Sequence, residues 1–514
     1  MSCFPGSSNF RCIQGALRDK TSCKPRQIST GYCVSSQSNW TNLSVWWIDT
    51  EVSRALGSGF STIGRGIQDA AHQPCSLRES VSMGESPMSS SIDMHLQAGR
   101  ELADYLFDDL RKNTWKDTGI CRDAYGEGEN YAHKLVAEVG ERLNLIVDRD
   151  AAANTYMTLP GRDRDAPPIV IGSHLDSVSA GGNYDGLAGV VSGLAAIAIL
   201  QSSGFRPRCD ITVMGVRAEE SMWFATSYFG SRAALGTLDP STLDRLTRYD
   251  TGKTLADHVA SSGGNPAALR NGEHHFVPKN IRAFMEVHIE QGPILETDSY
   301  PIGVVTGIRG NFRYPNARIL GEYQHCGGMP RGHRKDAVVA AAMLVEALNS
   351  LWRKFEDEGV DMAFTVGKLW TDPNQHSMTK VPGIAEFSLD VRSLDPDVLH
   401  QLKNEVTKLI SRISKDTGVK FEIGRVTNAP VGHMDQGIRD HLIAGAEKLG
   451  IKCRRIGSGA SHDAAAFSAA GVPVGMIFIR NANGSHNPDE DMALEDFMEA
   501  TRLLTWWLVE TNHD

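Results

Sequence analysis

The feature that most constrains the fold of this chain is a series of short apolar segments, each followed directly by polar residues. Residues 168–173, 211–216 and 283–287 are apolar runs of strand length, and an apolar run of helical length, residues 187–200, follows the first of them. Apolar strands that alternate with helices are typical of a mostly parallel sheet covered on both faces. Ligands of such sheets bind at the carboxyl ends of the strands, so the polar residues there form the candidate site.

Four polar clusters occupy these strand ends, and together they contain three histidines and several carboxylates. The clusters are residues 173–176 with 181–186, residues 217–220, residues 288–292 and residues 484–488. A single loop histidine is more often a hydrogen-bonded surface residue than a metal ligand. Four clusters at equivalent strand ends are harder to explain in that way, and imidazole and carboxylate groups are ligands that Zn²⁺ accepts. The pattern therefore predicts a metal site.

The spacing within these clusters suggests different tasks for the carboxylates. Asp176, two residues after His174, can accept the second ring N–H of that histidine and fix its tautomer. Nearby glycines would let the Asp185 carboxylate approach and bridge two ions, although the same residues could form a plain turn. Adjacent Glu219 and Glu220 could divide metal binding from general-base chemistry, and the alternative is a solvated charged pair.

The alternation of strands and helices changes between residues 300 and 429. A long β region, a helix, two strands, a second helix and a further strand give the order βαββαβ, which describes an α+β layer with an antiparallel sheet. The earlier alternation returns after this segment. The sequence thus predicts an α/β protein with a split, mostly parallel catalytic domain, residues 94–299 and 430–514, and an inserted lid or dimerisation domain, residues 300–429.

Residues 1–93 differ in composition from the rest of the chain. They are rich in serine, hold five of the nine cysteines and show no helical or strand periodicity, so we expect a poorly ordered extension. One alternative is a transit peptide. Another is that the true start is Met83, Met88 or Met94.

Composition excludes several function classes. The formal net charge of −10 argues against a nucleic-acid partner, and no apolar run reaches the roughly 20 residues that span a membrane. The four later cysteines are isolated and show no C-x-x-C spacing. We therefore expect free thiols in a reducing compartment, the cytoplasm.

The polar clusters also resemble those of a known family, the hydantoinase/carbamoylase branch of the M20 dinuclear metallohydrolases. The resemblance runs from about Met94 to the C-terminus and rests on Gly-Ser-His-Leu-Asp at 172–176, Gly-Asn-Tyr-Asp-Gly at 182–186, Glu-Glu at 219–220, His-Ile-Glu-Gln-Gly at 288–292, Gly-Ala-Ser-His-Asp-Ala at 459–464 and Ser-His-Asn-Pro at 485–488. It implies two divalent ions per subunit, zinc or alternatively manganese, cobalt or nickel. Asp185 would bind both ions, with His174 and His288 on one and Glu220 and His486 on the other.

The resemblance further implies catalytic and substrate-binding residues. Glu219 becomes the general base, and Gln291 contacts the carbamoyl group of the substrate. His325 reaches the active site of the partner subunit and stabilises the oxyanion there, so the resemblance implies a homodimer whose site is completed in trans. Arg392 binds the substrate carboxylate, a task that suits a guanidinium fork. Thr379 stands where a substrate-binding Asn is common, which leaves the exact substrate open. Without the resemblance, His325 and Arg392 would read as a turn histidine and a strand-face ion pair.

The expected activity is metal-dependent hydrolysis of the ureido C–N bond of an N-carbamoyl-L-amino acid or a related ureido acid, giving the amino acid, CO₂ and ammonia. His288 stands where peptidases of the superfamily usually carry a carboxylate, which favours this branch. The alternatives are an allantoate amidohydrolase and an M20 aminoacylase or dipeptidase. A non-catalytic metal-binding protein is a remote alternative, since it would be expected to lack Glu219.

Overall fold

A computed structural model describes residues 92–512 of the chain. The expected extension, residues 1–93, therefore lies outside the described residues except for its last two, and so do Met83 and Met88. Ile92 is buried in the hydrophobic core, and Asp93 accepts two hydrogen bonds from the Arg502 guanidinium, so these two residues belong to the folded part. Within residues 92–512, no helix is long and apolar enough to cross a bilayer.

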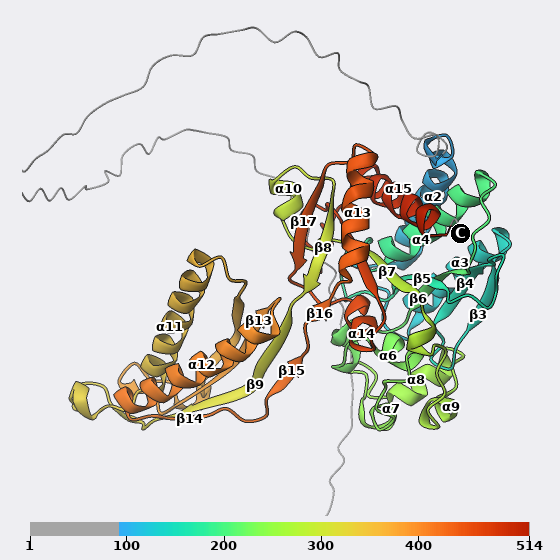
Figure 1. Ribbon diagram of the computed structural model, residues 1–514. Helices are drawn as coiled ribbons and strands as arrows, with labels where there is room; N and C mark the ends of the chain where they lie inside the picture. The colour runs from blue at the N-terminus through green and yellow to red at the C-terminus, as the bar shows by residue number, and fades with distance from the viewer. Residues whose placement is uncertain (1–91, 513–514) are drawn as a thin grey trace, which may run out of the picture. The chain divides into compact units, whose positions relative to one another are not determined.

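A nine-stranded mixed sheet lies at the centre of this fold (Figure 1). Its middle strands are parallel and lie in the order β18 (Val474–Ile479), β7 (Ala283–Ile289), β5 (Ile169–His174) and β6 (Ile211–Val216). Antiparallel pairs extend the sheet through β4 (Thr155–Leu159) and β3 (Ile146–Arg149) on one side and through β8 (Ile302–Ile308) and β16 (Gly432–His433) on the other. The remaining strand, β17 (Cys453–Ser458), pairs in parallel with β8.

The four middle strands are buried along their whole length, which accounts for the continuous apolar runs in the sequence. Successive side chains alternate between two hydrophobic clusters, with Ile171 and Met285 in one and Val170 and Phe284 in the other. Both faces of the sheet are therefore covered. Because the parallel strands share one carboxyl edge, the polar residues that follow them are brought together.

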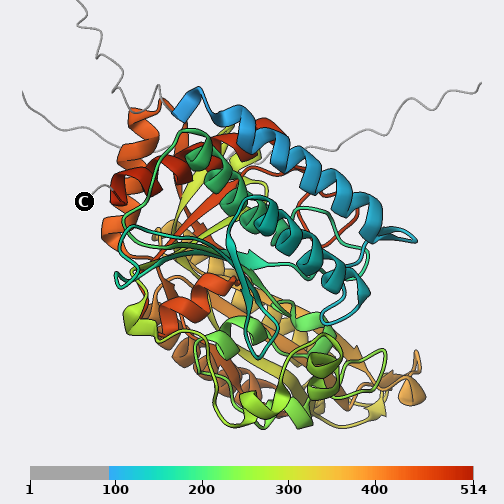
Figure 2. The same ribbon diagram turned by 90° about the vertical axis from the view of Figure 1, so that its right-hand side faces the viewer.

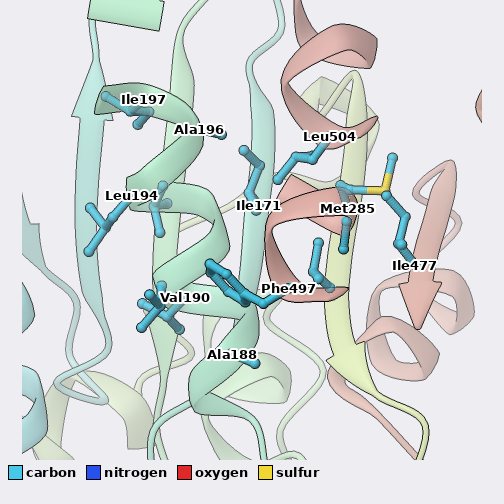
Figure 3. Packing of buried hydrophobic residues seen from close by; sticks show 14 of the residues in the cluster. Ile171, Ala188, Val190, Leu194, Ala196, Ile197, Met285, Ile477, Phe497 and Leu504 are labelled. Atoms are coloured by element: carbon cyan, nitrogen blue, oxygen red, sulfur yellow. The ribbon is translucent and has the colours of Figure 1, made fainter. Parts of the chain in front are cut away.

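Helices cover the two faces of this sheet. One face is covered by α2 (Leu96–Thr114), α4 (Leu187–Ser202) and α15 (Leu494–Thr511), with α2 in the foreground of Figure 2. The other face is covered by α14 (Asp463–Ala469) and α6 (Phe229–Ala234). Figure 3 shows Phe497 and Leu504 of α15 beside the strand residues Ile171 and Met285, with Leu194 of α4 in the same hydrophobic cluster.

Helix α4 is apolar around its whole circumference and is buried from residue 187 to residue 200. It lies close to the sheet because Gly189 has no side chain. A Cβ at this position would lie 2.3 Å from the Val287 carbonyl oxygen and 2.7 Å from the Ser173 Cβ. Glycine therefore allows the first turns of α4 to rest on the ends of β5 and β7, next to His174 and His288.

A second, antiparallel sheet is formed by residues between 310 and 429. It has five strands, β11 (Ala363–Thr371), β13 (Ile384–Ser393), β9 (Gly310–Leu320), β14 (Lys420–Glu422) and β15 (Thr427–Ala429), of which the last also pairs with β9. Helices α11 (Ala337–Asp357) and α12 (Pro396–Thr417) pack on it (Figure 1). The main elements follow the order βαββαβ, and the predicted fold class is confirmed.

The long β region that the sequence indicates near residues 302–322 divides between the two sheets. Strand β8 pairs with β18 and β17 in the central sheet, whereas β9, which begins two residues later, pairs with β13 in the second sheet. The hydrophobic cluster under the second sheet contains only residues 312–423. Each sheet thus has a core of its own, and the chain passes between them at Arg309 and at residues 430–431.

Candidate active site

The four polar clusters meet at the carboxyl edge of the central sheet, in a cavity of about 760 Å³. They come from the ends of β5 and β7, from the turn after β6 and from the loops after β5 and β18. The ionisable side chains of these clusters that line the cavity are His174, Asp185, Glu219, Glu220, His288 and His486. The structure therefore brings together the five predicted ligands and the predicted base.

Asp185 lies at the centre of this group and faces ligand-type atoms with both carboxylate oxygens. Its Oδ1 lies 3.4 Å from the Nε2 of His174 and 3.1 Å from the Nε2 of His288. Its Oδ2 lies 3.4 Å from the Nε2 of His486, which in turn lies 3.1 Å from an Oε1 of Glu220. Two clusters of potential metal ligands thus share one carboxylate.

The first cluster fits a cation. The Nδ1 atoms of His174 and His288 lie 3.0 and 2.8 Å from the backbone carbonyls of Asp176 and Ile289, and a carbonyl can only accept, so each Nδ1 carries the proton. In the neutral rings, both Nε2 atoms then bring a lone pair close to Asp185 Oδ1, a buried oxygen without a well-aligned donor, and the Nε2 of His288 also accepts the Gly186 N–H at 3.3 Å. A proton or a metal ion between them resolves this conflict. Burial alone would lower the pKa of His288, but the hydrogen bond and the negative charge of the Asp185 carboxylate raise it above its usual value. The position therefore favours a positive charge.

The second cluster is more exposed and its shared oxygen has other partners. Asp185 Oδ2 accepts hydrogen bonds from the Gln291 side-chain amide at 2.7 Å and from the Ser485 hydroxyl at 2.6 Å. The His486 side chain is about half exposed, at 51%. The predicted substrate residue Gln291 thus lies directly beside the predicted bridging ligand, with its amide group in the cavity.

Asp176 holds the turn that carries the two adjacent glutamates. Its Oδ1 and Oδ2 each accept a backbone N–H, from Glu219 and Glu220, at 3.0 Å. The same carboxylate approaches the Nδ1 of His174 at 3.5 Å, while the closer contact of that ring is to the Asp176 carbonyl. The sequence assigned Asp176 to the histidine alone, and the structure adds the clamp on the glutamate turn.

Glu219 and Glu220 both line the cavity, but their surroundings differ. The Glu220 carboxylate contacts His486, whereas the Glu219 side chain makes no hydrogen bond within the described part of the chain. Burial raises the pKa of Glu219 well above its usual value, and the negative charges of Glu220 and Asp463 raise it further. The arrangement leaves one glutamate beside the ligand cluster and one able to exchange a proton with a bound molecule.

Two buried residues that the sequence analysis missed hold the ligand loops. The fully buried Arg122 guanidinium donates to the backbone carbonyls of Leu175 at 2.8 Å, Asp185 at 3.1 Å and Asn183 at 3.4 Å. Glu490 accepts the backbone N–H groups of Tyr184 and Asp185 at 2.8 and 3.2 Å.

No signal in the sequence identifies Arg122. Glu490 follows His486 by four residues and also accepts a hydrogen bond from Ser485, so its place in the ligand loop was the available clue.

Arg392 lines the same cavity from the second sheet. Its Nε and one terminal nitrogen donate to the two oxygens of Asp390 at 3.2 and 3.0 Å, and its other terminal nitrogen donates to the Gly459 carbonyl at 2.8 Å. Arg392 therefore forms the ion pair expected on a strand face, and it also lies in the site, as the resemblance implies. Asp390 holds the guanidinium so that it remains in the cavity wall.

His325 and Thr379 do not line this cavity. His325 lies in β10 (Gln324–His325), is exposed, and accepts the N–H groups of Gly327 and Gly328 at its Nδ1. The carbonyl of Thr379 accepts the N–H of Cys326, the residue after His325. The two predicted residues, His325 and Thr379, are therefore neighbours. Within one subunit they are apart from the other candidate residues.

Comparisons with known proteins agree with this geometry. A family profile, Peptidase family M20/M25/M40, matches residues 170–509. The chain is 30% identical over 395 residues to an N-carbamoyl-L-amino-acid amidohydrolase of Pseudomonas sp. (strain NS671), covering 76% of this chain and 92% of that protein. It is 30% identical over 390 residues to a ureidoglycolate hydrolase of Oryza sativa subsp. japonica, covering 75% and 79% of the two chains.

Solved structures give the same result. A hydantoinase/carbamoylase family amidase of Burkholderia multivorans superposes with a TM-score of 0.71 at 29% identity, covering 81% of this chain and 98% of that one. The family and the ligand-type clusters together indicate a site for divalent metal. The chain belongs to peptidase family M20/M25/M40, and within that family it is similar to the hydantoinase/carbamoylase branch.

Proposed function

We propose that this protein hydrolyses the ureido C–N bond of an N-carbamoyl-L-amino acid or a related ureido acid, releasing the amino acid, CO₂ and ammonia. The observation that carries the proposal is the convergence of two ligand clusters, the unpartnered Glu219 carboxylate and the Arg392 guanidinium in one cavity. The names of the relatives support a ureido substrate, since they include N-carbamoyl-L-amino-acid amidohydrolases and ureidoglycolate hydrolases at about 30% identity.

We propose that the site holds two divalent ions, zinc or alternatively manganese, cobalt or nickel. His174 and His288 would hold one ion, Glu220 and His486 the other, and Asp185 both. Nitrogen and carboxylate ligands of this kind suit zinc and its neighbours in the first transition series. When bound, such ions supply Lewis acidity, which makes water nucleophilic near neutral pH.

Glu219 is the proposed general base. Its carboxylate is buried at the cavity wall and makes no hydrogen bond in the described part of the chain, so it can accept a proton from the attacking water. It then returns that proton to the leaving nitrogen. This step is favoured because burial and neighbouring carboxylates raise the pKa of the Glu219 carboxyl, so that it can carry the proton. Asp176 fixes the backbone of this residue and so its position.

Two further groups orient the substrate in this proposal. Gln291 has a side-chain amide that can donate to, and accept from, a ureido group, and it lies beside Asp185. The Arg392 fork takes the substrate carboxylate from the second sheet. These contacts would place the scissile bond between the ligand clusters and the second sheet.

We further propose a homodimer in which His325 and the neighbouring Thr379 of one subunit complete the site of the other. Both residues lie outside the cavity of their own subunit, and His325 is exposed, which leaves its ring free to donate to a substrate oxygen. We also propose a reducing compartment such as the cytoplasm, supported by the free thiols of the four cysteines in the described part of the chain.

A substrate panel tests the proposed reaction. Purified protein with added Zn²⁺, Mn²⁺ or Co²⁺ should release ammonia from members of a set of N-carbamoyl-L-amino acids, β-ureidopropionate, ureidoglycolate and allantoate. The allantoate and ureidoglycolate arms decide between the carbamoylase and the alternatives named among the relatives. Turnover of N-acyl amino acids or dipeptides alone would show instead an aminoacylase or dipeptidase.

The role of Glu219 is tested by Glu219→Gln. This variant should lose turnover by about 10²-fold or more, the usual scale of general-base catalysis, while it retains the metal content of the unaltered protein. Glu273→Gln is a suitable control because Glu273 is exposed and does not line the cavity. An active Glu219→Gln enzyme would refute the assignment.

A further inference from the structure

Four arginines line the cavity, and three of them have carboxylate partners. In the second sheet and at its edge, the Nε of Arg309 lies 3.0 Å from both oxygens of Asp361. Asp390 accepts from Arg313 at 2.8 Å and from Arg392 at 3.0 Å. These three guanidinium groups are therefore held in place by two carboxylates.

Arg232 is the fourth arginine, and its guanidinium has no such partner. It is half-buried on α6, and the hydrogen bonds that the structure gives it are made by its backbone N–H and carbonyl, to Tyr228 and Thr237. No carboxylate in the described part of the chain lies within ion-pair distance of it. Its charge reaches the exposed Asp239 only weakly, because the pKa of that carboxyl is lowered mainly by Ser241 and then by Arg245.

A count of charges on this part of the wall leaves a positive excess. Arg309 is balanced by Asp361, and one of the pair Arg313 and Arg392 is balanced by Asp390, so one positive charge remains in the second sheet. Arg232 adds another from α6. The Asp185 and Glu220 carboxylates contact the histidines of the ligand clusters, and the Glu219 carboxylate is the proposed general base. Two anionic groups on one ligand would match this excess.

The surroundings of Arg232 suit an extended side chain with a polar end. Helix α14 packs against α6 (Figure 1). It contributes the small side chains of Ala465, Ala466 and Ala469 to the cavity wall, which leaves room for a substrate chain. Ser227 and Thr237 also line the cavity, and the Thr237 hydroxyl donates to the backbone carbonyl of Arg232. A methylene chain along the alanines that ends in a carboxylate would therefore have the Arg232 guanidinium as its donor.

We propose that Arg232 binds a second carboxylate of the substrate, so that the preferred substrates are ureido dicarboxylic acids, such as the N-carbamoyl derivative of an acidic amino acid. This inference rests on the proposed function, in which Arg392 takes the first carboxylate. Arg232 then selects the substrate side chain, and the two guanidinium groups hold the ligand at both ends. A carboxylate is the group that a single guanidinium fork neutralises with matched geometry.

Binding of inert acids tests Arg232 without any turnover. By titration calorimetry, glutarate should bind the metal-loaded protein about 10-fold or more tightly than butyrate, the scale of one charge-assisted hydrogen-bonded pair. Arg232→Gln should remove this difference, Arg232→Lys should keep part of it, and Arg245→Gln should leave it intact, since Arg245 is exposed and outside the cavity. An unchanged glutarate-to-butyrate ratio in Arg232→Gln would overturn the inference.

Turnover gives the second readout. The ratio of kcat/KM for N-carbamoyl-L-glutamate to that for N-carbamoyl-L-glutamine should fall about 10- to 100-fold in Arg232→Gln, since only the first substrate has the second carboxylate. An equal loss for both substrates would overturn the inference and assign Arg232 a structural role. If the unaltered protein hydrolyses no ureido acid, the proposed function fails, while the glutarate measurement still decides whether Arg232 binds an anion.

Discussion

The position of the Asp185 ligand depends on residues that hold its loop, and Arg122 holds this loop near both of its ends. Its guanidinium is fully buried and donates to the carbonyls of Leu175 and Asp185, near the two ends of the loop between β5 and α4. It forms no ion pair within the described residues, so its charge is compensated by the dipoles of these carbonyls and by nearby carboxylates. Such residues act on a metal through its ligands.

Arg122→Met should therefore weaken metal binding. The variant loses the donors that fix the Leu175 and Asp185 carbonyls, and we expect metal affinity to fall about 10- to 100-fold, the usual effect of removing an outer partner of a ligand. Competition with a chromophoric chelator measures the affinity, and circular dichroism reports whether the fold is retained.

Arg248→Met is the matched control. Arg248 is also a buried arginine, but it bonds to Asp123, Asp250 and the Ala124 carbonyl, away from the ligand loops. The Arg248→Met variant should have a lower free energy of unfolding without a comparable loss of metal affinity. Equal losses of affinity in both variants would show that Arg122 has a general structural role only.

The sequence predicts the ligands better than it predicts the residues that hold them. His174 and His288 stand directly at the ends of apolar strands, so the strand pattern and the chemistry of imidazole are enough to place them together. Arg122 and Glu490 are held by contacts to chain segments 53 or more positions away, and those contacts exist only after folding. A charged residue in a loop is usually solvated, and no local pattern distinguishes Arg122 from that case, whereas Glu490 has one clue, its place four residues after His486.

At the scale of secondary-structure elements, the position of α4 against the sheet decides how the histidine-bearing strand ends lie. Gly189→Ala places a methyl group 2.3 Å from the Val287 carbonyl, so the helix or the strands must shift. We expect a loss of about 1–3 kcal/mol in the free energy of unfolding, the usual cost of overpacking a core. Thermal unfolding of the metal-free protein measures this loss.

Gly332→Ala is the control for this substitution. A Cβ at residue 332 meets no atom within 4 Å, so the midpoint of unfolding should stay close to that of the unaltered protein. A Gly189→Ala variant as stable as Gly332→Ala would mean that α4 can move away from the strands without loss.

The membership of strands in sheets was harder to predict than the strands themselves. Residues 302–322 read as one β region because apolar residues recur throughout β8 and β9, with only Arg309 between the two strands. Their partners, β18 for one and β13 for the other, come from distant segments, so local periodicity cannot separate them. The order of elements around them could be predicted because each helix has its own apolar period.

At the scale of the whole molecule, the proposed dimer predicts that two inactive variants can restore activity to each other, which a site formed within one subunit does not predict. Glu219→Gln and His325→Ala should each inactivate the homodimer, but in a mixed dimer one site combines an intact Glu219 with an intact partner His325. Random assembly of equal amounts gives this site in about a quarter of all positions, because a C₂ dimer pairs the two subunits reciprocally. Co-expression should therefore restore about a quarter of the unaltered activity.

A mixture that stays as inactive as its parents would show that His325 acts within its own subunit. Glu219→Gln co-expressed with the double variant Glu219→Gln/His325→Ala is the control, since no intact base is present in any site. Activity in that control would point to contamination rather than to complementation.

The chain crosses between the two sheets at two points that lie next to each other. The second sheet and its helices can therefore be removed together. Ile308 of β8 pairs directly with Gly432 of β16, while the cluster under the second sheet draws no residue from outside 312–423. Replacing residues 309–431 by Asn-Gly would turn β8 and β16 into an ordinary two-residue hairpin. The shortened protein should fold, keep its metal and lose turnover, because Arg392 leaves with the excised part. In evolutionary terms, residues 309–431 then correspond to a domain inserted into a single hairpin. Metal analysis and thermal unfolding of the shortened protein would test whether the rest of the chain folds without it.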